Sequence, residues 1–308
     1  MNELVQLLLS PKLFVLYAIV AAAAFIHFRG KERLSFTRQL TDHSTFMAPY
    51  NSLMYLFSGV PNEPILDTAL FPDLARLRES WETIRDEARA LYEEGHVKAA
   101  ETYDDLAFNS FFRTGWKRFY LKWYDEPLPS ARDLCPKTVE LVESIPNLNA
   151  AMFALLGPRS QLVIHRDPFA GSLRYHLGLI TPNSEDCRIV IDGTPHVWRD
   201  GRDVLFDETY LHHAVNDTDE ARIILFADVL RPLRFAPVRA LNRFVVHHMV
   251  KGTAAKNRQG DRVGALNKVF GAVYRIRLVG KRIKAWNKTA YYAMKYVLFG
   301  GILYLVFF

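Results

Sequence analysis

The chain has 308 residues, of which 50% are hydrophobic, and it carries a formal net charge of +6 at pH 7. This length allows one large domain or two small ones. The only two cysteines, Cys135 and Cys187, argue against a disulfide framework and fit a reducing, cytosolic compartment. No glycine-rich phosphate loop follows a predicted strand, which argues against nucleotide binding.

The first predicted element is an apolar run at residues 11–28, which contains one lysine, Lys12, and one histidine, His27. About 18 residues are close to the minimum length for crossing a bilayer. Basic residues such as Arg29 and Lys31 follow the run. By the positive-inside rule, they predict an uncleaved transmembrane helix with the next segment in the cytoplasm. A cleaved signal peptide and a buried core helix are the alternatives.

Helical periodicity dominates the next region. Apolar residues recur at three- and four-residue spacing over residues 63–96, and Gly95 indicates a helix stop. We expect these helices, within a helical cytoplasmic region at 29–120, to pack against a sheet. A proline-rich loop at 124–136 leads into a short helix with Pro136 in its first turn.

From about residue 150 the pattern changes to short β-rich runs. Runs such as QLVIH, SLRYHLGLI and ARIILFADV are separated by Pro, Gly, Asn and Asp. About eight short strands with turn residues between them favour a double-sheet jelly roll. We therefore expect a jelly-roll (double-stranded β-helix) domain at residues 121–232, with helices flanking it on the N-terminal side.

Residues 231–288 form a strongly basic segment, with 15 lysines and arginines against one acidic residue, Asp261. Apolar residues alternate with the basic ones at helical spacing. This pattern predicts amphipathic helices on an anionic membrane surface at residues 233–288. Nucleic acid is the other partner that such a run can bind. The neighbouring apolar runs favour the membrane, and we expect no nucleic-acid partner.

The chain ends in a second apolar run, residues 289–308, whose only charge is Lys295. It predicts a second transmembrane helix, with a re-entrant or interfacial helix as the alternative. Both runs place the middle of the chain in the cytoplasm. The expected fold is therefore mainly β, with a jelly-roll core, N-terminal flanking helices and a transmembrane helix at each end.

A His-x-Asp pair, His165 and Asp167, carries the predicted chemistry together with a later histidine. Residues i and i+2 of a strand point to the same face, so these two side chains converge. Two histidines and one carboxylate form the facial triad of non-haem Fe(II) oxygenases, which leaves positions open for O2 and a co-substrate. The later histidine is His212 or His213, and only one of these neighbours can reach the metal. A surface ion pair of Asp167 is the alternative.

Three further residues are expected around a co-substrate. Arg222 opens an apolar strand, where an unpaired charge is costly, so it needs an anionic partner. A dicarboxylate co-substrate is the functional partner, and Asp207 or Asp228 is the structural alternative. Arg174 and His176 share one face of another strand, and we expect both to contact the co-substrate near the metal. A hydrogen-bonded core histidine is the alternative for His176.

The motifs H-x-D, LRYHLGLI, W-x-x-G, FDETYLHH and R-x-x-L-F-A-D-V resemble the aspartyl/asparaginyl β-hydroxylase family of 2-oxoglutarate oxygenases, over about residues 105–232. The resemblance implies a jelly-roll core in which O2 and 2-oxoglutarate are used to hydroxylate an unactivated C–H bond, with succinate and CO2 as by-products. It selects His212 over His213. It assigns iron to His165, Asp167 and His212, and 2-oxoglutarate to Arg222, Arg174 and His176.

The predicted membrane spans and basic tail are similar to the overall plan of bacterial lipid A 2-hydroxylases. This resemblance implies an inner-membrane enzyme with a cytoplasmic catalytic domain that hydroxylates the 2-position of a secondary acyl chain of lipid A, in lipopolysaccharide. A hydroxylase of ornithine lipid or another membrane lipid and a peptidyl aspartyl/asparaginyl β-hydroxylase are the enzymatic alternatives. A membrane-anchored binding module is the non-enzymatic one, and the intact triad argues against it.

Overall fold

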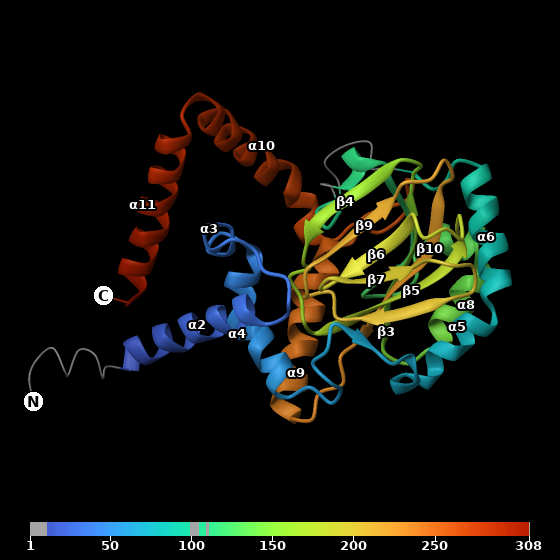
Figure 1. Ribbon diagram of the computed structural model, residues 1–308, viewed down its shortest axis with the longest axis horizontal. Coiled ribbons are helices and arrows are strands. Elements are labelled where there is room, and N and C mark those ends of the chain that lie inside the picture. The colour runs from blue at the N-terminus through green and yellow to red at the C-terminus, as the bar shows by residue number, and fades with distance from the viewer. Residues whose placement is uncertain (1–10, 99–104, 109–110, 308) are drawn as a thin grey trace, which may run out of the picture.

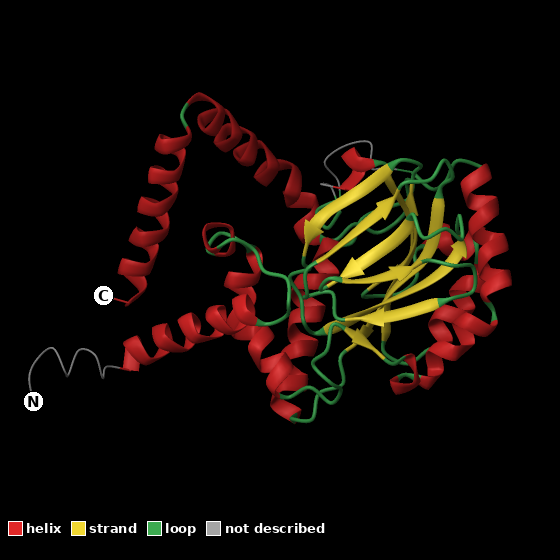
Figure 2. Ribbon diagram, viewed as in Figure 1, coloured by secondary structure: helices red, strands yellow, loops and turns green. Residues whose placement is uncertain are grey.

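Two antiparallel sheets form the centre of the computed structural model, which describes residues 11–98, 105–108 and 111–307 (Figures 1 and 2). The larger sheet has the order β1-β8-β5-β10-β3-β2, and the smaller has the order β4-β9-β6-β7. The strands are β1 (Ile65–Leu66), β2 (Trp116–Trp123), β3 (Leu148–Leu156), β4 (Ser160–His165), β5 (Ser172–Ile180), β6 (Cys187–Ile191), β7 (Thr194–Val197), β8 (Asp203–Phe206), β9 (His212–Asn216) and β10 (Arg222–Leu230).

Strands β3 to β10 are divided equally between the two sheets. Four of them follow the order β8-β5-β10-β3, and the other four follow β4-β9-β6-β7. This is the arrangement of an eight-stranded jelly roll. Strands β1 and β2 extend the edges of the larger sheet. The structure therefore has the jelly-roll core that the short, regularly spaced β-rich runs predict.

The burial of each strand follows from its sequence. The central strands β3, β5 and β10 are almost completely buried, because one face meets the smaller sheet and helices cover the other. Helix α6 contacts β5 and α8 contacts β3 (Figure 1). Strands β6 and β9 alternate buried and half-buried residues, as expected for a sheet with one solvated face. The core therefore lies between the two sheets.

Helices and helical turns make up nearly half of the residues that the structure describes, so the expected description of the fold as mainly β is wrong. In the described residues they are α2 (Pro11–Phe28), α3 (Phe36–Gln39), α4 (His43–Leu56), α5 (Ala75–Glu79), α6 (Trp81–Glu93), α7 (Pro129–Leu134), α8 (Pro136–Ser144), α9 (Ala236–Val245), α10 (Ala265–Trp286) and α11 (Lys288–Phe307). The short turns are η1 (Thr68–Leu70), η2 (Pro72–Leu74), η3 (Phe111–Thr114), η4 (Val246–Val250) and η5 (Lys251–Thr253).

The prediction of a transmembrane helix at each end is also wrong. Among the helices that the structure describes, none is both long and apolar enough to cross a membrane. Helices do form at both apolar runs, as α2 and α11 (Figure 1). Part of their apolar surface contacts other protein segments. Ile26 of α2 is buried in a cluster with α4, and the ring centroids of Phe299 of α11 and Phe46 of α4 are 5.7 Å apart. Apolar composition alone did not distinguish these contacts from a bilayer.

The end of α2 is fixed to the jelly roll by a buried ion pair. The Arg29 guanidinium bonds to Asp207 and lies over the rings of Tyr55 and Tyr210, at 3.7 and 3.9 Å from their centroids. Asp207 also accepts a hydrogen bond from Arg231 at 2.8 Å. One carboxylate therefore pairs with two buried cations and joins α2 to the strand ends of the larger sheet.

This ion pair predicts a large effect on stability. Asp207→Asn leaves Arg29 and Arg231 buried without a counter-charge, and we expect it to lower the free energy of unfolding by about 3–5 kcal/mol. Both arginines hold the pKa of Asp207 well below its usual range, although burial alone would raise it. In the unfolded chain the pKa of Asp207 is about 3.9, and in the folded protein it is lower. The charged carboxylate therefore stabilises the wild type fully above about pH 3.9, and this stabilisation is lost as the pH falls from there toward the pKa of the folded state.

Urea unfolding at pH 7 and at a series of acidic pH values measures this contribution. Asp219→Asn is the matched control, because Asp219 pairs with Arg159 on the surface and both side chains are mostly exposed. We expect little change in the control. An Asp207→Asn protein as stable as the control would contradict the structural role of the buried pair.

Candidate metal and co-substrate site

Three potential metal ligands meet where β4 and β9 pair. His165 ends β4, Asp167 follows two residues later, and His212 begins β9 opposite His165 in the register. One ligand atom of each residue lies within 4.8 Å of the others. The Nε2 atom of His165 is 3.9 Å from Oδ1 of Asp167, and the imidazole centroids are 4.3 Å apart. Two imidazoles and one carboxylate at this spacing can hold one divalent metal ion.

Backbone carbonyls orient both imidazoles. Nδ1 of His165 is 2.7 Å from the carbonyl oxygen of Val163, and Nδ1 of His212 is 2.9 Å from that of Tyr210. An Nδ1–H that donates to a carbonyl leaves Nε2 unprotonated, which is the form that binds a metal. Burial, followed by the effect of His165, lowers the pKa of His212 to about 3, so this ring is neutral at pH 7.

His213 lies outside the cluster. As the neighbour of His212 on β9, it faces the other side of the strand. It is half-buried and pairs in register with Val190 of β6. The structure therefore brings together His165, Asp167 and His212. Their assignment as iron ligands stays a prediction that this geometry favours.

Arg174 lies beside the cluster and bonds to carboxylates. Its Nη1 donates to Oδ2 of Asp167 at 2.7 Å, and its Nε donates to Oδ1 of Asp228 at 2.6 Å. Oε2 of Glu208 is 3.2 Å from the same Nε. Burial alone would raise the pKa of Asp167, but Arg174 and the two histidines lower it to about 2. The resemblance assigned Arg174 to the co-substrate, whereas its donors hold the carboxylate of a candidate metal ligand.

Arg222 is a buried cation without a counter-ion among the described residues. It is 2% exposed, and its guanidinium lies 4.0 Å from the centroid of the Trp198 ring. Its Nε atom has no hydrogen-bond partner, and burial lowers its pKa to about 10. The two structural partners considered from the sequence, Asp207 and Asp228, bond to other arginines. The guanidinium therefore remains available for an anion.

His176 is a second buried polar group without a partner. Neither ring nitrogen has a hydrogen-bond partner within the described part of the chain. The ring lies among aromatic side chains, with centroid distances of 5.0 Å to Phe206 and 5.3 Å to Phe226. Burial, followed by the charges of Arg174 and Arg222, lowers its pKa well below the usual value. Buried polar groups normally have partners, so these orphaned atoms indicate a missing polar ligand.

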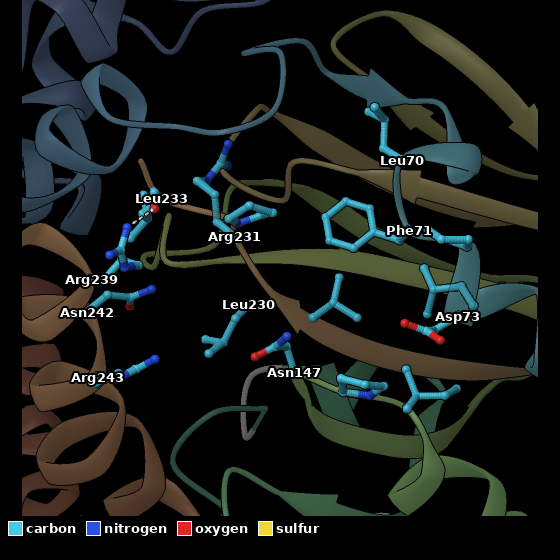
Figure 3. A pocket seen from close by; sticks show the side chains of 16 residues that line it. Leu70, Phe71, Asp73, Asn147, Leu230, Arg231, Leu233, Arg239, Asn242 and Arg243 are labelled. Atoms are coloured by element: carbon cyan, nitrogen blue, oxygen red, sulfur yellow. Dashed lines mark hydrogen bonds between the residues drawn. The ribbon is translucent and has the colours of Figure 1, made fainter. Parts of the chain in front are cut away.

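One narrow cavity of about 40 Å³ brings these groups together between the two sheets. All six predicted site residues line it, and most of its other lining is aromatic or aliphatic. A larger cleft of about 410 Å³ lies between α9, the end of β10 and the segment after α8 (Figure 3). It shares no lining residue with the cavity. Its only carboxylate is Asp73, and no histidine or cysteine lines it, so the cavity is the candidate site.

Several residues around the cavity were not singled out from the sequence. Glu208 is 2% exposed and accepts a hydrogen bond from Ser172 at 2.9 Å. Tyr124 donates to Asp228 at 2.9 Å. The signal that could have revealed this buried ion network is the pair of consecutive acidic residues, Asp207 and Glu208, directly after β8. Trp198, whose ring lies against the Arg222 guanidinium, appeared in the sequence only as the first residue of the W-x-x-G motif.

Residues 78–232, half of the chain, match the model of the family described as aspartyl/asparaginyl beta-hydroxylase. An ornithine lipid ester-linked acyl 2-hydroxylase from Rhizobium tropici is 34% identical over 193 residues, which are 62% of this chain and 68% of that protein. Two human proteins are more distant. Aspartate beta-hydroxylase domain-containing protein 2 is 29% identical over 52% of this chain, and aspartyl/asparaginyl beta-hydroxylase is 25% identical over 61%.

The chain spans less than half of the length of these two human relatives, 45% and 25% respectively. The matched region includes the jelly-roll core and all six predicted site residues. The resemblance inferred from the motifs is thus confirmed at the level of the family. The chain belongs to the aspartyl/asparaginyl β-hydroxylase family and is a hydroxylating oxygenase.

Proposed function

We propose that the chain is an Fe(II)- and 2-oxoglutarate-dependent dioxygenase that hydroxylates the 2-position of an acyl chain of a membrane lipid. The observation that carries the proposal is Arg222. A fully buried guanidinium without a counter-ion is costly, and here it lines the same cavity as a His-Asp-His cluster. A dicarboxylate co-substrate placed between the metal and this arginine removes the cost.

The residues of the cavity fit both groups. His165, Asp167 and His212 would hold the iron through two neutral imidazoles and one carboxylate, with coordination positions left for O2 and the co-substrate. Arg222 would bind the far carboxylate of 2-oxoglutarate through parallel N–H donors, and His176 would contact its polar atoms. When bound, the iron would activate O2, which is the oxidant, and 2-oxoglutarate would supply two of the electrons, so that O2, 2-oxoglutarate and a C–H bond become an alcohol, succinate and CO2.

A membrane lipid fits the composition of the helices around the core. The basic segment at 231–288 provides positive charge for anionic head groups. Large apolar side chains are exposed on several helices, among them Phe14, Val20 and Phe28 of α2, Phe244 of α9, and Val297 and Leu305 of α11. Such surfaces support association with a bilayer. We place the enzyme at the cytoplasmic face of the bacterial inner membrane, where 2-oxoglutarate and reduced iron are supplied.

Two lipids are candidates for the substrate. Lipid A carries phosphates on a sugar backbone, and the basic segment matches that charge better than it matches a zwitterionic head group. We therefore propose a secondary acyl chain of lipid A as the first candidate. Ornithine lipid is the second, because the relative from Rhizobium tropici is named as a hydroxylase of an ester-linked acyl chain of that lipid.

Mass spectrometry of lipids from a deletion strain tests the proposal. We expect one lipid class to lose the mass of one oxygen atom, and we expect wild-type protein, but not His212→Ala, to restore it. A loss confined to lipid A supports the first candidate, and a loss confined to ornithine lipid selects the second. Unchanged lipids together with an altered protein would contradict the lipid proposal and favour a peptidyl hydroxylase.

A further inference from the structure

The two oxygens of Asp167 have different partners. Oδ1 lies on the side of His165, 3.9 Å from its Nε2 atom, and Oδ2 accepts a hydrogen bond from Nη1 of Arg174 at 2.7 Å. The backbone N–H of Asp167 also donates to the carbonyl oxygen of Glu208 at 2.8 Å. The backbone of Asp167 is thus held by Glu208, and its carboxylate by Arg174. One oxygen remains for the metal and the other is occupied.

Arg174 is itself fixed by the strands around it. Its Nε donates to Asp228 of the neighbouring strand β10, and Asp228 is opposite Arg174 in the β5–β10 register. The other oxygen of Asp228 accepts from the Tyr124 hydroxyl at 2.9 Å, and the ring of Phe226 lies 3.8 Å from the guanidinium. Both Arg174 and Asp228 are nearly completely buried. The guanidinium therefore has one orientation, which is set by the larger sheet.

We propose that Arg174, held by Asp228, is a positioning residue that fixes the carboxylate of Asp167 as a metal ligand. The inference rests on the proposed metal site and gives Arg174 a role beside the co-substrate contact that the resemblance implied. Asp167 follows the end of β4 in a connection between the sheets, where no strand pairing fixes its side chain. The bond from Arg174 supplies this constraint. Residues that hydrogen-bond to a metal ligand orient it, and their loss weakens metal binding by roughly 10–100-fold.

The geometry of the guanidinium explains why lysine cannot replace it. Arginine presents Nε and Nη1 in one rigid plane, so it bonds to Asp228 and Asp167 simultaneously. The single ammonium of lysine keeps the charge but cannot reproduce both bonds at these positions. Arg174→Lys therefore keeps the positive charge but loses the paired hydrogen bonds that orient Asp167, and Arg174→Met loses both the charge and the hydrogen bonds.

Cobalt binding to the full chain, with endogenous metal first removed by a chelator, tests the proposal without turnover. Co(II) is titrated alone and followed by calorimetry and by its visible absorption, which reports ligand geometry. We expect Arg174→Lys and Asp228→Asn to weaken Co(II) binding, with Arg174→Lys about 10–100-fold weaker than wild type and altered in spectrum. Arg174→Met should be weaker still. If it fails to fold, the Lys and Asn variants carry the test.

Arg222→Met is the matched control, because Arg222 is a buried arginine of the same cavity that has no bond to Asp167. It should bind Co(II) like wild type and lose affinity for 2-oxoglutarate. Wild-type Co(II) affinity and spectrum in Arg174→Lys, or equal weakening in Arg222→Met, would overturn the positioning role. Failure of the wild-type chain to bind Co(II) would instead remove the metal site on which the inference rests.

Discussion

His212→Ala is expected to abolish detectable metal binding and 2-oxoglutarate turnover. Its imidazole is neutral, is oriented by the carbonyl of Tyr210 and lies beside Nε2 of His165 and the carboxylate of Asp167. Removing one of three ligands should cost more than the roughly 100-fold loss seen when a residue that merely orients a ligand is removed. Anaerobic Fe(II) titration and succinate release measure the two effects.

His213→Ala is the control for this variant. The two histidines are adjacent in sequence, but His213 is half-buried on the other face of β9 and does not belong to the cluster. We expect its replacement to leave Fe(II) binding and turnover close to wild type. Full activity of His212→Ala combined with loss in His213→Ala would show that the ligand assignment is wrong.

Arg222→Met is expected to stabilise the protein and to eliminate binding of 2-oxoglutarate. Arg222 has the burial of a core residue and no counter-ion among the described residues, and replacement of buried ionic groups by apolar ones of similar volume can gain about 1–4 kcal/mol. With redox-inactive Mn(II), 2-oxoglutarate at about 100 times its Kd should stabilise the wild type by about 2.7 kcal/mol. The variant should show no such gain.

Urea unfolding with and without Mn(II) and 2-oxoglutarate measures both effects of Arg222→Met. Arg231→Met is the control, because Arg231 is also buried but pairs with Asp207 at 2.8 Å. It should be destabilised, because the Asp207 carboxylate and the carbonyl oxygen of Ala170 both lose a buried hydrogen bond. A destabilised Arg222→Met protein, or one that 2-oxoglutarate still stabilises, would mean that Arg222 is a structural residue.

The jelly roll could be predicted because its signal is local. Short apolar runs separated by turn residues report strand number directly, and a two-residue period reports which side chains share a face. This period grouped His165 with Asp167 correctly, although Asp167 lies just past the end of β4 rather than within it. The edge strands β1 and β2 were not predicted, since β1 has only two residues and pairing with β8 defines it.

The sequence could not predict which group each buried arginine pairs with, because the pairing depends on contacts between segments that are distant in the sequence. Arg174 and Arg222 both read as inward-facing arginines of apolar strands. Only the register places Asp228 opposite Arg174 and leaves Arg222 opposite Leu156. The apolar run at 11–28 had the same ambiguity, since its composition fits a bilayer and also fits packing against α4. The periodicity of a sequence identifies the apolar face of a helix or strand, but it does not tell whether protein or lipid covers that face.

The most direct test of the proposed activity is succinate formation by the purified full chain with Fe(II), O2, 2-oxoglutarate and a total bacterial lipid extract. The account predicts that succinate appears in step with a lipid that has gained one oxygen atom, and that His212→Ala and Asp167→Ala produce neither. No consumption of 2-oxoglutarate by the wild type under these conditions, or equal succinate formation by both variants, would contradict it.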